Sequence, residues 1–407
     1  MTPGLESQAP SRGFTATVEE WLPANRNTRA FWGVMAAFLV HGLVVSTWVS
    51  RIAGMKGVLR LGDGTLGLCL LGAAIGSVTA IPITGALVTR FGSRRIAIGT
   101  CAGFCLALVP LALTRGVAML VPALVFYGVM AGANDVAMNS LAVGTEKMLG
   151  TPTISRFHAM FSLGGIIGAG LGALAAAHRM PLNWHLLAGT AVTLLIACLA
   201  ARLTVETRSE AAVAHAPRLR RIPMALVALS AIGFCIFLSE GAIADWTAVY
   251  LKQVLHAGAG VAPLGYAVFS AAMATFRFTG DAITLRIGRG WTIRAGGSIA
   301  AAGLALVVTA HSPYQALAGF FLAGAGFSSI IPLVFAAGGR IPEVAEGAGV
   351  ATVSGLGYLG FLAGPPAIGF ISEAFSLRAG LGLLVVLSAF AALMVSAVER
   401  RKPNPLS

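Results

Sequence analysis

The stretch Gly85-Ala-Leu-Val-Thr-Arg-Phe-Gly-Ser-Arg-Arg95 joins two long apolar segments and carries three of the 28 basic residues of the chain. A shorter version of it, Arg286-Ile-Gly-Arg-Gly290, follows 196 residues later. The same offset pairs glycines in corresponding apolar segments: Gly128 with Gly324, Gly164 with Gly360, and Gly168 with Gly364. One match means little in a chain with 51 glycines, but several at one offset indicate an internal repeat.

The composition around this repeat is that of a membrane protein. Of the 407 residues, 57% are hydrophobic and only 11% are charged, and the mean hydropathy is +0.84. Soluble domains carry about 25% charged residues, and a helix needs about 20 mostly apolar residues to cross a bilayer. We predict an all-α integral membrane protein of twelve transmembrane helices in two pseudo-symmetric six-helix bundles. The predicted helices lie near 30–50, 65–88, 96–114, 118–142, 157–177, 183–201, 223–249, 261–285, 293–310, 314–337, 347–371 and 377–398.

The polar stretch 202–221 divides these segments six and six. We therefore expect an N-terminal tail over 1–28, a bundle over 29–201, a linker over 202–221, a second bundle over 222–398 and a tail over 399–407. Counting loops and tails, 20 Lys and Arg residues fall on one side of the membrane and seven on the other. By the positive-inside rule we expect both termini and the linker on the cytoplasmic side of an inner membrane.

Several classes of protein do not fit. The net charge is +13, but the basic residues are concentrated in the loops on one side of the membrane. They form no basic-aromatic patch on a soluble domain, which argues against nucleic-acid binding. The five cysteines lie in apolar segments without a CxxC pair or a nearby His cluster, so we expect no disulfide and no metal site. No G-x-x-x-x-G-K-[ST] loop or clustered His and Asp motif occurs. We therefore expect no cofactor, no enzymatic activity and energy from an ion gradient.

The stretch 85–95 resembles a loop signature of the major facilitator transporters, G-x-x-x-D-R-x-G-R-R. In that family the signature lies between helices 2 and 3. The second copy, from Asp281 to Gly290, is a degenerate version. Thr89 stands where the family has an aspartate that helps to close the inward gate. The resemblance implies gating roles for Gly85, Arg90, Gly92, Arg94, Arg95, Asp281, Arg286 and Gly288.

The resemblance extends over the whole chain in length, topology and half-symmetry. The segments 134–139, 157–165 and 357–366 are similar to a bacterial branch of the family near its sugar–proton symporters. The resemblance implies a monomer in the lipid bilayer that moves a small solute, coupled to protons, through a site between the halves. Proton-antiport efflux of drugs or metabolites stays open as an alternative, as does a non-transporting scaffold or sensor.

Ionisable residues inside membrane spans are costly and mark candidate functional sites. Asp135 lies one helical turn before Asn139, so that the pair can bind a proton or a substrate hydroxyl, or instead join two helices. Glu240 lies deep in its helix, and Asp245, about 140° around that helix, is closer to the periplasmic end. We predict a coupling or binding role for Asp135 and Glu240.

Six polar residues, among them Asp281 of the second loop, are also candidates. Arg277 and Asp281 have the spacing of an intrahelical ion pair, in which Arg277 recognises an anion or serves structure alone. A titrating His41 and a hydrogen-bonding Asn134 are possible site residues or packing groups. Arg156 and His158 begin a helix at the cytoplasmic boundary, where they gate the pathway or extend toward the interface.

Overall fold

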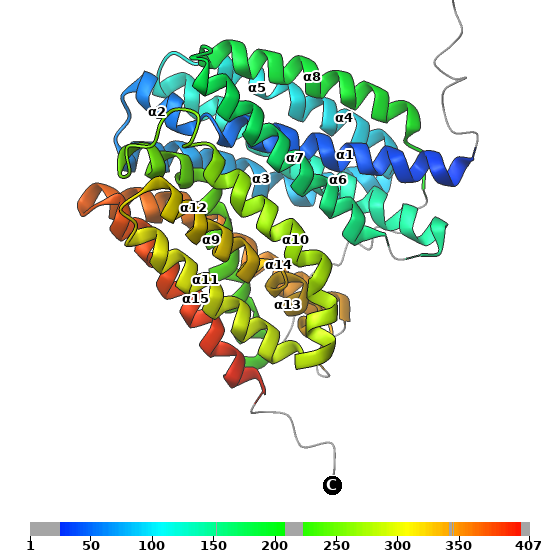
Figure 1. The fold of residues 1–407 in the computed structure, drawn as a ribbon. Helices are drawn as coiled ribbons and strands as arrows, with labels where there is room; N and C mark the ends of the chain where they lie inside the picture. Colours follow the sequence, from blue (N-terminus) through cyan, green and yellow to red (C-terminus); the bar gives the residue numbers. More distant parts are fainter. Residues whose placement is uncertain (1–24, 152, 208–222, 342–343, 345, 400–407) are drawn as a thin grey trace, which may run out of the picture.

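The structure is a computed structural model that describes residues 25–151, 153–207, 223–341, 344 and 346–399 (Figure 1). Most of the predicted N-terminal tail and linker, and nearly all of the C-terminal tail, lie outside these residues. The described part is helical and contains no strand. Among the described residues eleven helical spans are long and apolar enough to cross a membrane, and α10 (Leu264–Ile287) is a further long helix that carries Arg277 in its second half.

The first bundle contains α1 to α8, and its helices match the six predicted segments. Two details differ: a short helix follows the first span after a turn, and the third span is divided in two. The helices are α1 (Arg26–Val49), α2 (Ile52–Leu59), α3 (Asp63–Phe91), α4 (Ser93–Leu106), α5 (Leu108–Ala112), α6 (Val117–Leu149), α7 (Ile154–Ala177) and α8 (Leu182–Leu203).

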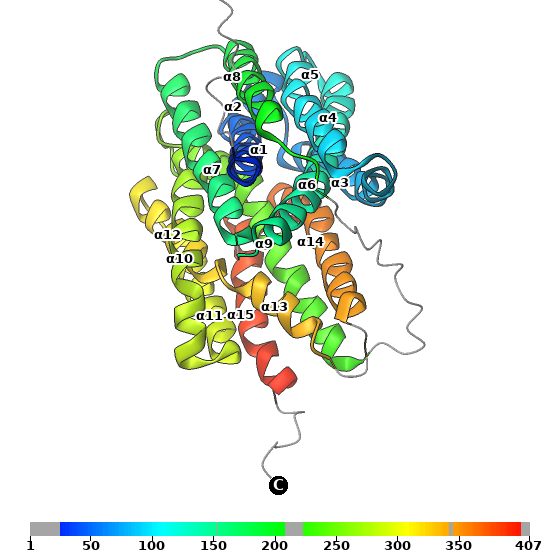
Figure 2. The same cartoon turned by 90° about the vertical axis from the view of Figure 1, so that its right-hand side faces the viewer.

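The second bundle contains the remaining helices and again matches six predicted segments, one of which is divided. Its helices are α9 (Met224–Gln253), α10, α11 (Arg289–Val308), α12 (Pro313–Phe327), α13 (Ile330–Gly338), α14 (Glu346–Ala374) and α15 (Leu377–Glu399). Figure 2 shows the two bundles stacked, with α9 and α14 at the surface that faces the first bundle.

Proline explains both divided helices. A proline has no N–H and cannot bond the carbonyl four residues earlier. Pro110 releases the carbonyl of Leu106, next to the break between α4 and α5. Pro332 releases the carbonyl of Ser328 between α12 and α13, and Arg277 donates a hydrogen bond to it at 3.3 Å.

The repeat of 196 residues is visible in how glycines pack. Gly128 lies against the backbone of Ala73 where α6 crosses α3, and Gly324 lies against Phe269 where α12 crosses α10. Ala73 and Phe269 are themselves 196 residues apart. Glycine lets the helix backbones come this close, as is common between membrane helices. The two bundles therefore use the same helix crossings at equivalent positions.

The two ends of the molecule differ in how the bundles meet. We call the end that carries Arg26 and Glu399 the terminal end, and the end that carries α2 and the α9–α10 connection the far end. Figure 1 shows the bundles close together at the far end and spread apart toward the terminal end. Helices α3 and α14 cross between the bundles, and so do α7 and α10.

Candidate functional site

Two glycines give the paired loops at the terminal end the same backbone shape. Gly92 ends α3 and precedes α4 with φ 89° and ψ 147°, and Gly288 ends α10 and precedes α11 with φ 83° and ψ 158°. This region is open essentially only to glycine. Each glycine N–H bonds a carbonyl four residues earlier, at 2.9 Å in both loops. The resemblance between the two sequence stretches is therefore a resemblance in structure.

The first loop docks on the chain that follows α8, in its own bundle. Arg94 Nε donates to the Thr204 carbonyl at 2.7 Å, and the Ser93 hydroxyl donates to the Thr207 carbonyl at 3.4 Å. The Glu206 carboxylate lies against Gly92 and accepts from the Arg94 N–H at 3.5 Å. A carboxylate is favourable here, because the N-terminus of α4 carries partial positive charge.

The other predicted gating residues make few contacts. Arg90 lies over the Phe91 ring at 5.1 Å, while Arg95, Arg156 and Arg286 are exposed. No described atom lies within 4 Å of a Cβ built on Gly85. His158 is half-buried with its ring 5.0 Å from that of Phe38. Asp281 belongs to α10, but its side chain lies outside what the structure describes, so its pairing with Arg277 stays a prediction.

The far end has contacts between the bundles. The Glu373 carboxylate of α14 accepts a hydrogen bond from the Gly64 N–H at 3.0 Å, in the first turn of α3. A Cβ on Gly67 would lie 2.6 Å from the Pro365 carbonyl oxygen, so α3 and α14 meet backbone to backbone. Beside this crossing Lys56 pairs with Asp63 at 2.7 Å. The far end is thus closed by a glycine crossing and a carboxylate bound to a helix N-terminus.

Between the two ends, ionisable groups of both bundles come together. Tyr358 of α14 lies within electrostatic range of Asp135 of α6 and of Glu240 of α9. The Asp135 carboxylate accepts from Asn139 Nδ2 at 3.1 Å, as the spacing of four residues predicts. Glu240 Oε1 is buried without a hydrogen-bond partner among the described residues. The structure therefore brings Asp135 and Glu240, predicted separately, within range of one tyrosine of α14.

Arg277 supplies positive charge to this cluster. It lies within electrostatic range of Glu240 and of His158 from α7. Tyr266, about three turns before Arg277 on α10, lies within range of Glu240, Arg277 and Asp245. Four helices of the two bundles, α7, α9, α10 and α14, thus contribute titratable or hydroxyl groups to this cluster.

Asn134 and His41 make their hydrogen bonds within the first bundle, beside His158 of the cluster. Asn134 is fully buried, its Nδ2 donates to His41 Nδ1 at 2.8 Å, and its Oδ1 accepts from the Thr100 hydroxyl at 3.3 Å. The His41 ring also packs 4.8 Å from the Phe104 ring. These partners are all in the first bundle, so the structure places Asn134 and His41 in a network that joins α1, α4 and α6.

Sequence reasoning did not single out Tyr266. In the sequence, Tyr266 is marked only by an aromatic hydroxyl one turn before Ser270 in an otherwise apolar segment. A tyrosine that packs between helices would give the same pattern. The group was recognisable only once α9 and α10 were placed side by side. Within the described residues no cluster of three or more His, Cys, Asp or Glu side chains could hold a metal.

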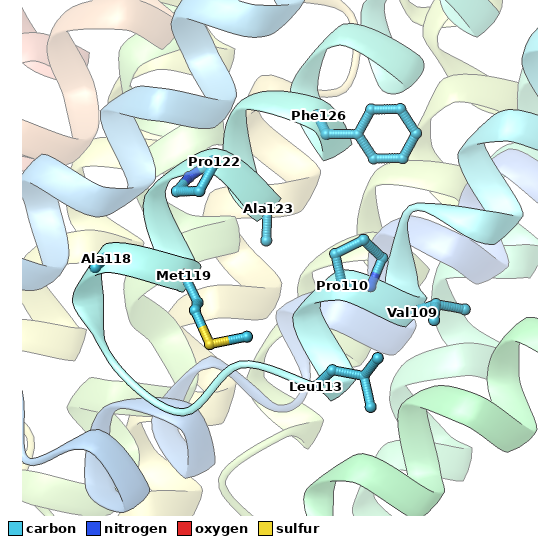
Figure 3. Close-up of a pocket in the computed structure, with 8 residues that line it drawn as sticks. All are labelled: Val109, Pro110, Leu113, Ala118, Met119, Pro122, Ala123 and Phe126. Carbon is cyan, nitrogen blue, oxygen red and sulfur yellow. The ribbon is translucent and has the colours of Figure 1, made fainter.

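A cavity of about 490 Å³ lies between α5 and α6, apart from the titratable cluster. Figure 3 shows side chains that line it, such as Pro110, Pro122 and Phe126. All eight lining residues are apolar, and none belongs to the titratable cluster. Since Met119 and Phe126 are exposed, this cavity opens on the outer apolar surface of the bundle.

Comparisons of sequence agree with this architecture. The sequence profile of the Major Facilitator Superfamily matches residues 30–340 and, in an overlapping match, residues 229–407. An uncharacterized MFS-type transporter of Yersinia pestis is 36% identical over 367 residues, covering 89% of this chain and 94% of its own length. Membrane protein MosC of Rhizobium meliloti is 31% identical over 353 residues, covering 86% and 85%.

Solved structures show the same fold. The bacterial homologue of the human lysosomal transporter Spinster, in an inward-facing and unoccupied conformation, superposes with a TM-score of 0.76 at 14% identity, covering 94% of this chain and all of its own. The nucleoside transporter NupG gives a TM-score of 0.69 at 13% identity, covering 93% of this chain and all of its own. The protein is a multi-pass membrane protein, and the chain belongs to the Major Facilitator Superfamily.

Proposed function

We propose that the protein carries a small polar solute across the bacterial inner membrane by alternating access, coupled to protons through Asp135 and Glu240. The observation that supports this most directly is the position of Tyr358 within electrostatic range of both carboxylates. Asp135 belongs to the first bundle and Glu240 to the second, and substrate sites of this architecture lie between the repeats. A proton or solute bound here would sense the relative position of the two bundles.

Glu240 is the group we assign to coupling. A buried carboxylate without a hydrogen-bond partner is costly, and a proton or a bound ligand removes most of that cost. Arg277, within electrostatic range, stabilises the ionised form once the proton leaves. Asp135 with Asn139 offers an acceptor and an amide one turn apart, which suits the hydroxyl groups of a sugar-like solute.

The orientation follows from the charge distribution. With 20 basic residues on the terminal side and seven on the opposite side, the terminal end is cytoplasmic and the far end periplasmic. The arrangement in Figure 1 is then closed toward the periplasm. We assign the two bundles, the cytoplasmic linker over 202–221 and the two tails as the sequence predicts, and a monomer as the working unit in the bilayer.

Proteoliposomes loaded with a pH-sensitive dye test this proposal. A panel of monosaccharides, nucleosides and small carboxylic acids is added under an imposed pH gradient, and solute-dependent proton entry is recorded. We expect one class of solute to carry protons inward in the native protein. The Asp135→Asn and Glu240→Gln variants should abolish this signal, while Asp245→Asn, five residues along α9, should retain most of it.

The same assay separates the alternatives. Proton movement opposite to that of the solute would indicate antiport efflux instead of symport. A scaffold or sensor would be folded in the proteoliposomes but would transport none of the solutes in the panel. Gradient-driven uptake that persists with unchanged pH dependence in both carboxylate variants would contradict the assignment of Asp135 and Glu240.

A further inference from the structure

A small cavity lies at the far end, between the two bundles. Its volume is about 180 Å³, and it is lined where the α1–α2 junction and the α7–α8 turn face the end of α9 and the start of α10. Three cationic side chains contribute to its wall: Arg51 and Arg179 from the first bundle and Lys252 from the second. None of the twelve lining residues is acidic.

Arg51 forms the buried part of this wall. The residue is only 8% exposed, and its Nη2 donates to the Met180 carbonyl at 2.8 Å. Its Nε has no hydrogen-bond partner among the described residues. A guanidinium is always charged and offers five N–H donors in a fixed fork, so a buried one with an unused donor is costly. The fork has the geometry that matches a carboxylate or phosphate.

Two acidic groups at the far end are already engaged. Asp63 pairs with Lys56 at 2.7 Å, and Glu373 accepts from the Gly64 N–H at 3.0 Å. Arg179 and Lys252 are exposed at the mouth of the cavity, and neither forms an ion pair within the described part of the chain. One buried guanidinium and two exposed cations thus line the cavity.

We propose that Arg51, Arg179 and Lys252 form a binding site for a small oxyanion, a carboxylate or phosphate group, at the periplasmic end. The volume lies below the about 300–1,000 Å³ of pockets for larger ligands, which suits a single anionic group. Because the cations come from both bundles, a bound anion favours the state in which the far end is closed. The site is separate from the cluster at Asp135 and Glu240, and its test does not require transport.

The test is a binding titration on the purified full chain in nanodiscs of phosphatidylcholine. Sodium phosphate and, separately, sodium acetate are titrated at constant ionic strength by calorimetry, and the thermal midpoint is followed in parallel. We expect saturable binding to the native protein. Lys252→Gln, an exposed position that leaves the fold intact, should weaken it about two- to fivefold.

Arg51 is tested with two variants. Arg51→Lys keeps the charge but loses the fork, and Arg51→Gln loses both, so we expect weakening of about tenfold or more in each. Arg115→Gln is the matched control, because it removes one exposed charge from the same end without lining the cavity. Its affinity should equal that of the native protein. Equal affinities in all four variants would overturn the assignment.

The source of the anion is decided by the lipid. If free phosphate does not bind but nanodiscs containing phosphatidylglycerol raise the thermal midpoint, and raise it less in Lys252→Gln than in native protein, the site takes a lipid headgroup. If free phosphate binds in phosphatidylcholine, the site takes a soluble anion. The absence of both effects would overturn the proposal, whatever the outcome of the transport assay.

Discussion

The two ends of the protein are held by different kinds of contact. At the far end the contacts join the bundles: the backbone crossing at Gly67 and the Glu373 carboxylate on the N-terminus of α3. At the terminal end the described contacts of the first loop stay within one bundle, where Arg94 and Ser93 hold the chain after α8. The far-end contacts must break if the bundles separate at the far end, and those of the terminal loop need not.

Because of this difference, we expect residues of the terminal loop to affect the free energy of unfolding. We expect residues of the far-end crossing to affect the equilibrium between the closed and the open far end. A substitution in the Gly92 loop changes the free energy of unfolding in every conformation of the bundle. A substitution at the far-end crossing changes mainly the free-energy difference between the closed and open far end. The predictions below test this separation.

The largest expected effect is at the terminal loop. Gly92→Ala places a side chain at φ 89° and brings its Cβ to 2.8 Å from Glu206 Oε1, so that strain of about 1–3 kcal/mol and a steric contact add. Gly288→Ala is the matched control, because φ is 83° and no described atom lies within 4 Å. We expect a lower thermal midpoint in both, and the larger drop in Gly92→Ala.

The double variant Gly92→Ala with Glu206→Ala sharpens this comparison. Removing the Glu206 carboxylate relieves the contact but not the backbone strain, so the two substitutions should be non-additive. Equal midpoints for Gly92→Ala and Gly288→Ala would show that contact with Glu206 contributes nothing.

The next effect is at the crossing of α3 and α14. Gly67→Ala would place a Cβ 2.6 Å from the Pro365 carbonyl oxygen, and overpacking of this kind costs about 1–3 kcal/mol. This cost destabilises the state in which the far end is closed, so the buried position 262 is exposed more often. In a protein that carries Ala262→Cys, this cysteine should therefore react faster with an impermeant maleimide. Gly170→Ala, in open space on α7, should leave the reaction rate unchanged. An unchanged rate in Gly67→Ala would mean that the bundles do not separate there.

The smallest effect concerns the carboxylate on α3. Glu373→Gln keeps a hydrogen-bond acceptor for the Gly64 N–H but removes the negative charge from the helix N-terminus, worth about 0.3–1 kcal/mol. In a protein that carries Ala262→Cys, the maleimide reaction of this cysteine should accelerate by about two- to fivefold, with little change in the thermal midpoint. A slower reaction would show that Glu373 opposes closure.

Most of the fold could be predicted because the bilayer imposes one requirement on every span. The lengths of the apolar stretches predicted all twelve segments, and the glycines at a common offset of 196 residues identified the repeat. What could not be predicted was where a span divides. The breaks at Ala107 and at Ser328–Ser329 depend on whether a proline is tolerated as a kink, as Pro82 and Pro122 are, or separates two helices.

The site was less predictable, because depth in a helix does not give direction. Asn134 and Asp135 are adjacent, yet the first bonds His41 inside its own bundle while the second approaches Tyr358 of the other. A helix turns about 100° per residue, so neighbours face different partners, and only the packing of helices decides which.

The backbone crossings inside each bundle have a mechanical consequence. Gly164 lies against the backbone of α1 at Leu39, and Gly360 against α9 at Phe234, so these helices touch through atoms that have no rotamers to adjust. Packed interfaces of this kind switch between arrangements and do not stretch gradually. A distance sensor placed across the two bundles should therefore report two discrete lengths whose proportions shift with conditions, and no continuous series between them.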